Sequence, residues 1–301
     1  MISTRSYLLS FSALLLFTGC TEKASTLNPF SGKNAFQEVE ALLNYSPRDA
    51  GTAQGHRAAL HLSSRLDALG IENHLDYFTD MTPEGPKDMV NVMGHLRGDS
   101  NEWIILASHF DTMPGIDNFY GANDSGSSSG VLIELARVLK QANLLHNVLL
   151  VFFDGEEGIA NYIPGDGLHG SRYLATKIYT EGARDRYKAM ILLDMVGDRD
   201  LTYTIPVNSS PHLMRLLEES ADELDLSNFI EFTDLYIIDD HVPFQQIGIP
   251  AIDLIDFYYG SRPGENNYWH TEHDDLDHIS TESLQISGDI TLRILKKLGV
   301  F

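Results

Sequence analysis

Seven histidine, aspartate and glutamate residues in five segments of the chain could act together in chemistry. Most of them end or directly follow an apolar run, as in VFFDGEEG, and they are His109, Asp111, Asp124, Glu156, Glu157, Asp194 and His270. Imidazole and carboxylate groups without cysteine suit a catalytic zinc site, in which one position stays open for water or substrate. The residue types therefore predict metal-assisted chemistry.

Crowding of like charge supports this interpretation. Asp124, Glu157 and Asp194 would repel one another in a partly buried pocket unless a divalent cation lay among them. A single carboxylate at a strand end is more often a helix cap or a loop residue in contact with water. Five segments that each deliver such a group are harder to explain in that way, so the sequence predicts a cation among them.

Strands and helices alternate along the chain, which is typical of an α/β sheet with helices on both faces. Short apolar runs predict buried strands at residues 89–96, 102–110, 147–154, 188–196 and 249–257. Helical spacing of apolar residues predicts helices at 57–70, 127–141, 211–224 and 283–299. Ligands of such sheets bind at the carboxyl ends of the strands, so the candidate residues are expected at one edge.

The first 20 residues resemble a bacterial lipoprotein signal. An apolar stretch too short to span a bilayer follows Arg5, and the ending LFTGC places Cys20, the only cysteine, where lipidation is expected. We expect a lipoprotein signal peptide at 1–19, a lipid-anchored tether at 20–34 and a single catalytic domain at 35–301. Thr21 favours sorting to the outer membrane, facing the periplasm, and an ordinary signal peptide is the alternative.

The charge balance excludes some partners. The chain has 21 Lys and Arg against 43 Asp and Glu, a formal net charge of -22. Such acidity argues against binding to nucleic acid or to an anionic lipid surface. Because a second cysteine is absent from the sequence, no internal disulfide can form, and stability must come from packing or from bound metal.

The motifs SHFDT, GANDSGSSSG, FFDGEEG, LLDMVGD and YWHTEHDDLDHIS resemble those of the M28 family of zinc aminopeptidases and their relatives, the glutaminyl-peptide cyclotransferases. The resemblance runs from about residue 36 to the C-terminus and implies a three-layer α/β sandwich with a mixed, largely parallel central sheet. It implies that Asp124, Glu157 and His270 hold the principal zinc. His109 and Asp194 would hold a second metal in the aminopeptidases.

The resemblance also assigns roles beyond the metal. Glu156 would be the general acid and base, and Asp111 would orient the His109 imidazole. In the cyclases, Asp239 of IDDHVPF would join Asp194 in a hydrogen-bond chain beside Glu156. Trp269 would form an aromatic wall of the substrate pocket.

Local features favour the cyclase branch, and others depart from it. The run FFDGEEGIANYIPGDGLHGSRYLA, the motif DDHVPF and Trp269 resemble the cyclases, whereas GAND reads more like the aminopeptidases. Tyr162, expected in the substrate pocket, stands where animal cyclases carry tryptophan, and Asp253 stands where they carry histidine. His241 is expected to pack and hydrogen-bond rather than bind metal. The acidic run HDDLDH after His270 is expected to be a solvated face.

Three functions stay open at this point. The first is a zinc-dependent transferase that converts the N-terminal glutamine of a peptide to pyroglutamate with loss of ammonia, using one zinc. The second is an M28 aminopeptidase, a hydrolase of peptide N-termini that uses up to two zinc ions. The third is a lipoprotein that only binds on the same scaffold. The five residues Asp124, Glu156, Glu157, Asp194 and His270 are all present and argue against the third.

Overall fold

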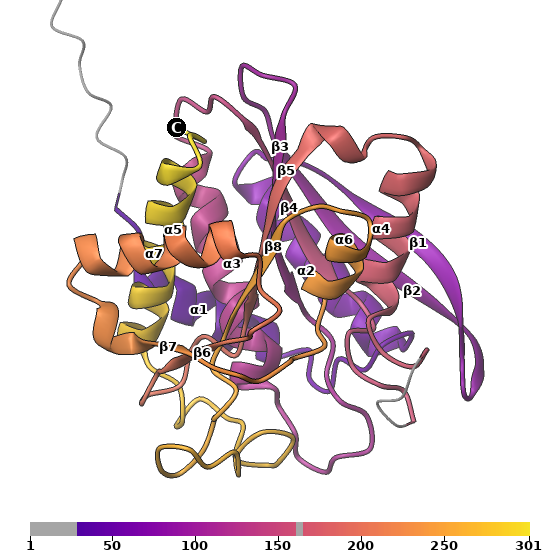
Figure 1. The fold of residues 1–301 in the computed structure, drawn as a ribbon. Helices are drawn as coiled ribbons and strands as arrows, with labels where there is room; N and C mark the ends of the chain where they lie inside the picture. The colour runs from indigo at the N-terminus through magenta and orange to yellow at the C-terminus, as the bar shows by residue number, and fades with distance from the viewer. Residues whose placement is uncertain (1–28, 161–164) are drawn as a thin grey trace, which may run out of the picture.

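A six-stranded sheet runs through the molecule in the order β1-β2-β4-β3-β5-β8 (Figure 1). This computed structural model describes residues 29–160 and 165–301. The strands are β1 (Glu72–Thr82), β2 (Gly85–Leu96), β3 (Trp103–His109), β4 (Asn147–Phe153), β5 (Tyr187–Asp194) and β8 (Ala251–Ile255). Strand β3 pairs in parallel with β4 and β5, β5 pairs in parallel with β8, and the β1–β2 and β2–β4 pairs are antiparallel. The expected mixed, largely parallel sheet is confirmed.

Helices cover both faces of the sheet and give three layers (Figure 1). One face carries α1 (Gly32–Leu43), α2 (Ala53–Ala68), α3 (Ser128–Leu139), α5 (Pro211–Glu223) and α7 (Thr281–Lys297). The other carries α4 (His169–Thr180) and α6 (His241–Gln246). Alternate residues of β4 point to opposite cores, since Val148 and Leu150 belong to the first and Leu149 and Val151 to the second. A strand buried on both faces must be apolar at every position, which explains the uninterrupted run NVLLVFF.

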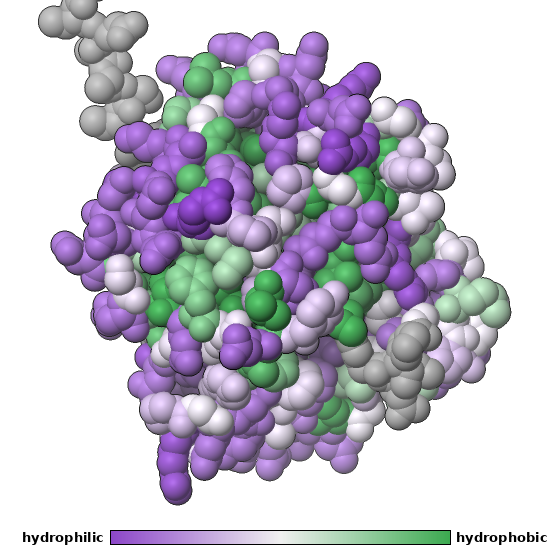
Figure 2. All heavy atoms as spheres, viewed as in Figure 1, coloured by the Kyte–Doolittle hydropathy of each residue, from purple (hydrophilic) through white to green (hydrophobic). Residues whose placement is uncertain are grey.

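Short elements complete the described chain. A π-helical turn, η1 (Ala122–Ser127), leads into α3, and the 3-10 turns η2 (Arg184–Arg186) and η3 (Ser227–Phe229) precede strands. Strands β6 (Tyr203–Ile205) and β7 (Ile230–Phe232) form a separate parallel pair. Hydrophilic residues cover much of the face in Figure 2, in keeping with the large net charge. Within residues 29–160 and 165–301, none of the helices is both long and apolar enough to cross a membrane.

The folded domain begins before residue 35. Helix α1 starts at Gly32, and the Ser31 side chain caps it by accepting a hydrogen bond from the Asn34 amide. Phe30 is only 5% exposed, and its ring packs so closely on Gly288 of α7 that a Cβ there would lie 2.3 Å from it. The predicted boundary at residue 35 was therefore too late. The residues around Gly32 are mostly polar, and their sequence does not indicate the helix cap or the burial of Phe30. The predicted signal peptide and Cys20 lie outside the described residues.

The strands end where the sequence predicted chemistry. Strands β3 and β5 end at His109 and Asp194, and β4 ends three residues before Glu156. Because the three strands are parallel neighbours, their carboxyl ends meet at one edge of the sheet. The fold thus brings residues from separate parts of the sequence into one region.

Replacing Phe30 with Ala in the full chain is expected to lower the free energy of unfolding by about 3 kcal/mol, because it empties a buried aromatic site. The matched control is Phe232→Ala, since Phe232 is 43% exposed on β7 and should cost far less. Urea unfolding of both variants measures the difference. Equal losses would show that residues before 35 contribute nothing special to the fold.

Candidate metal centre and active site

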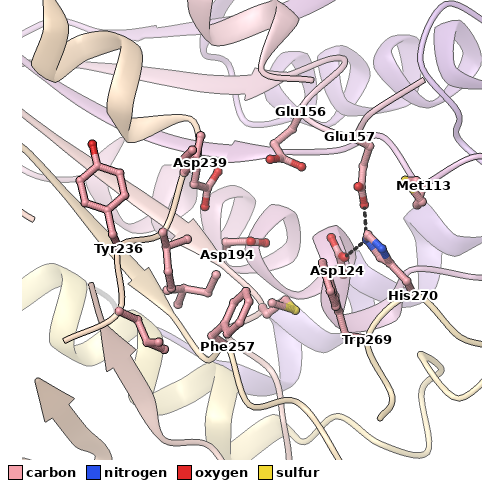
Figure 3. A pocket seen from close by; sticks show the side chains of 15 residues that line it. Met113, Asp124, Glu156, Glu157, Asp194, Tyr236, Asp239, Phe257, Trp269 and His270 are labelled. Carbon is pink, nitrogen blue, oxygen red and sulfur yellow. Dashed lines mark hydrogen bonds and ion pairs between the residues drawn. The ribbon is translucent and has the colours of Figure 1, made fainter. Parts of the chain in front are cut away.

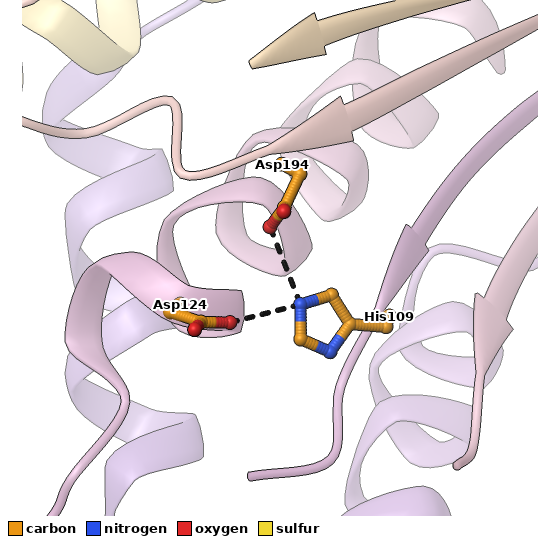
Figure 4. Close-up of side chains that lie close together, drawn as sticks. All are labelled: His109, Asp124 and Asp194. Atoms are coloured by element: carbon orange, nitrogen blue, oxygen red, sulfur yellow. Dashed lines mark hydrogen bonds and ion pairs between the residues drawn. The ribbon is translucent and has the colours of Figure 1, made fainter. Parts of the chain in front are cut away.

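One group of possible metal ligands joins the ends of β3 and β5. The Nε2 atom of His109 lies 3.0 Å from Oδ1 of Asp124 and 3.2 Å from Oδ1 of Asp194 (Figure 4). All three side chains are buried. The geometry brings together the residues that the resemblance assigned to a second metal and adds Asp124 to them.

A second group lies beside the first and shares Asp124 with it. The Nε2 atom of His270 lies 3.0 Å from Oε1 of Glu157 and 3.3 Å from Oδ2 of Asp124 (Figure 3). Asp124 therefore faces His109 with one oxygen and His270 with the other. The three residues predicted to hold the principal metal do lie together.

The donor atoms fit a cation of zinc's size. Ligands of a tetrahedral zinc at about 2.0 Å lie about 3.3 Å from one another. His270 Nε2 lies at 3.0 and 3.3 Å from its two carboxylate partners, close to that spacing. The set contains only nitrogen and oxygen donors and opens onto a cavity, which matches the needs of a catalytic rather than a structural site.

Electrostatics also point to a cation. Burial by itself would lower the pKa of His270, but Asp124 and Glu157 outweigh it and raise that pKa to about 10. Burial raises the pKa of Glu157 to about 7, and the neighbouring Asp124 adds to the effect. These carboxylates draw protons onto the site because they lack a counter-charge, and a bound cation would supply the same charge in place of the protons.

The cavity beside these ligands has a volume of about 430 Å³. Its polar side is formed first by the possible metal ligands Asp124, Glu157 and His270, called the ligand cluster below. Glu156, Asp194 and Asp239 complete that side, and their carboxylates lie near one another (Figure 3). Its other walls are apolar and comprise Met113, Met195, Leu235, Tyr236, Ile237, Ile238, Ile255, Phe257 and Trp269. A small, mostly apolar pocket with a few polar groups is the usual form of a substrate site.

The predicted pocket residues have different outcomes. Trp269 lines the cavity, and its ring stacks on His270 with centroids 4.0 Å apart. Asp239 also lines the cavity, beside Glu156, and its predicted place in a hydrogen-bond chain with that residue stays a prediction. Tyr162 lies outside the described residues.

Glu156 and Glu157 point to different places although they are adjacent. Glu157 reaches His270, whereas Glu156 faces the cavity near Asp239 (Figure 3). Burial raises the pKa of Glu156 well above its ordinary value, and Glu157, Asp240 and Asp194 raise it further against the opposing charge of His109. A carboxyl group with a raised pKa can both take up and release a proton near neutral pH.

Asp111 holds the backbone under both glutamates. Its Oδ1 accepts a hydrogen bond from the amide of Glu156 at 3.1 Å, and its Oδ2 accepts one from Glu157 at 3.2 Å. Nδ1 of His109 lies 3.4 Å from Asp111 Oδ1, within ion-pair distance but without a hydrogen bond, so the orienting role of Asp111 stays a prediction. Asp111 thus touches three residues of the site at once.

Two positioning residues were not predicted. Asp274 accepts hydrogen bonds from the amides of Asn123 and Asp124, at 2.6 and 3.0 Å, and is fully buried. The expectation that HDDLDH is a solvated face was therefore wrong for Asp274, which turns inward to hold the ligand loop. Asp124 and His270, from distant segments, are fixed relative to each other because this residue follows His270 by four positions.

Arg48 holds the same region from the other side. Its buried guanidinium donates hydrogen bonds to the carbonyl oxygens of Phe110, Tyr120 and Gly121. Burial lowers the pKa of Arg48 to about 10, against the attraction of nearby carboxylates such as Asp274, so it stays charged at neutral pH. The Arg48 side chain thus connects the segment that follows His109 with the one that precedes Asp124. No pattern around Arg48 in the sequence indicated this role.

Affinity for a divalent cation is expected to rise with pH. In the metal-free protein His270, with a pKa of about 10, carries a proton at neutral pH, and a cation must displace it. Lowering the pH therefore weakens binding, by about tenfold per unit for each proton displaced. The dependence should steepen below pH 7, where Glu157, with a pKa of about 7, takes up a second proton.

Competition between zinc and a chelator between pH 6 and 8 measures this dependence. The control is His278→Ala, because His278 pairs with Asp275 and belongs to neither group of possible metal ligands. It should leave the pH dependence unchanged. A zinc affinity that stays constant over this range would contradict the assignment of His270.

Comparison with known proteins identifies relatives over most of the chain. Residues 91–295 match the model of peptidase family M28. A glutaminyl-peptide cyclotransferase of Drosophila melanogaster is 29% identical over 273 residues, covering 80% of this chain and 75% of that protein.

Solved structures agree with these matches. The glutaminyl cyclase of an Acidobacteriales bacterium is 34% identical, with a TM-score of 0.85, and the match covers 90% of this chain and 96% of that one. A Zn-dependent exopeptidase of Parabacteroides distasonis is 25% identical, with a TM-score of 0.80 and coverage of 89% and 98%. The chain belongs to peptidase family M28, in its glutaminyl cyclase branch.

Proposed function

We propose that the chain is a zinc-dependent glutaminyl-peptide cyclotransferase, which converts the N-terminal glutamine of peptides or proteins to pyroglutamate and releases ammonia. One observation carries the proposal: Glu156, Asp194 and Asp239 line the same cavity as the ligand cluster, opposite apolar walls. Cyclisation needs proton transfer between two nitrogens of the substrate and no water molecule. A pocket with acidic groups on one side and apolar walls on the other suits that need.

The substrate supplies both reacting groups. Its α-amine attacks the carbonyl carbon of its own side-chain amide, so that a C–N bond forms in the ring and the bond to the amide nitrogen breaks. A zinc ion held by Asp124, Glu157 and His270 would polarise that carbonyl. Glu156 takes one proton from the attacking amine and gives one to the departing nitrogen, which leaves as ammonia.

The neighbouring carboxyl groups support this proton transfer. Burial raises the pKa of Asp194, and burial together with the charge of Asp253 raises the pKa of Asp239 well above its ordinary value. Protonated groups beside Glu156 can donate hydrogen bonds to it. The walls formed by Phe257 and Trp269 hold the substrate side chain and exclude water.

An aminopeptidase is the second candidate, favoured by one observation. His109, Asp124 and Asp194 form a complete second donor set, and one relative is a Zn-dependent exopeptidase. Two cations could clamp a water nucleophile and the oxygen of a peptide carbonyl. The number of zinc ions per chain bears on this alternative: one is expected for the cyclase and up to two for the aminopeptidase.

The location of the enzyme is part of the proposal. Cys20 would carry a lipid anchor that tethers the domain to the cell envelope, with the outer membrane facing the periplasm as the expected site. Labelling of the expressed chain with a lipid precursor, compared with Cys20→Ser, tests the anchor.

The reaction is tested by incubating the protein with two peptides that differ only in their first residue, glutamine or leucine. A mass loss equal to ammonia from the glutamine peptide, with the leucine peptide intact, is expected. Release of free leucine would overturn the cyclase and establish the aminopeptidase.

The two adjacent glutamates are expected to respond differently to the same substitution. Glu156→Gln should lower kcat by about 10²-fold or more, because it removes the proton carrier, while zinc stays bound. Glu157→Gln should lower the zinc content, because it removes a ligand. Metal analysis and rate measurements on both variants test this pair, and equal metal loss would contradict the separate roles.

A further inference from the structure

A third group of buried polar side chains lies behind the cavity. Asp239, His241 and Asp253 are at most 3% exposed, and each offers an atom within 4.8 Å of the others. The proposed reaction uses only Asp239. Its residue types are those of a metal site. Whether it could bind a metal depends on which nitrogen of His241 carries a proton.

The hydrogen bonds of Asn208 determine which nitrogen of His241 carries the proton. Oδ1 of Asn208 accepts a hydrogen bond from the Ile237 amide at 3.2 Å, and Nδ2 donates one to the Ile237 carbonyl at 2.9 Å. This backbone pair fixes the orientation of the Asn208 amide, since a flipped amide would face a donor with a donor. The second hydrogen of Nδ2 points to Nε2 of His241, 2.8 Å away.

Nε2 of His241 must therefore accept a hydrogen bond. Burial lowers the pKa of His241 to about 4, so the ring is neutral at pH 7 and carries one proton. With Nε2 as acceptor, that proton lies on Nδ1. A protonated nitrogen cannot bind a metal, which argues against a third metal centre.

The Nδ1–H group faces Asp253. Oδ2 of Asp253 lies 3.7 Å from Nδ1, and neither atom has a hydrogen-bond partner among the described residues. Asp253 and Asp239 are close enough to share a side-chain hydrogen bond, and both oxygens of Asp253 and one of Asp239 are buried without a partner elsewhere among the described residues. Buried acceptors of this kind need a donor, and the Nδ1–H of His241, 3.7 Å from Oδ2 of Asp253, is a group that can supply one.

We propose that Asn208 and His241 are positioning residues that present an N–H group to Asp253. The chain of contacts runs from the Ile237 backbone through Asn208 and His241 to Asp253, which lies beside Asp239. Through this chain the carboxyl group of Asp239 keeps its position beside the proton carrier Glu156. Ile237 itself lines the cavity, so one amide side chain ties the substrate wall to the acidic groups. The catalytic part of this inference rests on the proposed function.

The tautomer of His241 can be observed without any assay of activity. Long-range ¹H–¹⁵N correlation spectra of the full chain labelled at histidine nitrogens distinguish a protonated Nδ1 from a protonated Nε2. The His241→Asn spectrum assigns the signal by its loss. A neutral ring with the proton on Nδ1 is expected, also with zinc present. A proton on Nε2, or a zinc-shifted Nδ1, would overturn the inference.

Two amide substitutions at His241 separate positioning from mere packing. In His241→Asn the amide nitrogen can replace Nδ1 and donate to Asp253, whereas in His241→Gln it reaches the place of Nε2 instead. The Asn variant keeps a donor for Asp253 but loses the contact with Asn208, so it should keep most of the wild-type kcat, whereas the Gln variant should lose about tenfold in kcat with KM unchanged. Equal kcat values, or a change confined to KM, would contradict the positioning role.

A substitution at Asn208 tests the same chain from its other end. In Asn208→Asp the new carboxylate accepts a hydrogen bond from Nε2, so the proton of His241 should move there and the Nδ1–H signal should vanish. Retention of that signal would overturn the inference. If the wild-type protein cyclises no glutamine peptide, the proposed function fails, whereas the tautomer measurements still decide this inference on their own.

Discussion

The architecture of the site depends on one constraint, the burial of many like charges in a small volume. The edge of the sheet buries the carboxyl groups of Asp111, Asp124, Glu156, Glu157, Asp194, Asp239, Asp240 and Asp253. Ionised carboxylates cannot be removed from water together without counter-charge. A cation bound by Asp124, Glu157 and His270 would neutralise part of the set, and burial raises the pKa of Glu156, Asp239 and Asp253 well above their ordinary values, which favours their protonated forms. The same crowding thus favours metal binding at one side of the site and protonated carboxyl groups at the other.

Backbone contacts turn this crowding into distinct roles. Asp111 accepts hydrogen bonds from the amides of both Glu156 and Glu157, which fixes the backbone just after β4 at these two residues. One side chain then meets His270 and the other meets the cavity (Figure 3). Asp274 likewise fixes the backbone of the loop that carries Asp124, by accepting hydrogen bonds from its amides. The two glutamates, identical in chemistry, therefore direct their side chains to different places because Asp111 holds the backbone at both.

The sequence revealed those features whose signals are local. A strand that ends in His109 or Asp194 shows an apolar run followed by a polar residue, and the α/β architecture follows from the alternation of such runs. Arg48 and Asp274 gave no such signal, because their partners are backbone groups far away in sequence. The domain start was misplaced for the same reason, since Phe30 is buried by Gly288 at the opposite end of the chain. Contacts made through main-chain atoms leave no residue pattern to read.

The two reactions considered for this scaffold need the same ligands and differ in where the nucleophile comes from. A hydrolase must admit water to the cation, whereas a cyclase must keep water from competing with an amine that the substrate already carries. Apolar residues such as Ile237, Phe257 and Trp269 form the walls opposite the acidic groups and favour the second case. Within such walls, a proton taken from the amine can be returned only to the substrate or to the carboxyl groups beside Glu156. The carboxyl groups of Asp194 and Asp239, which line the cavity with that glutamate, therefore favour a proton shuttle over a water-activating base.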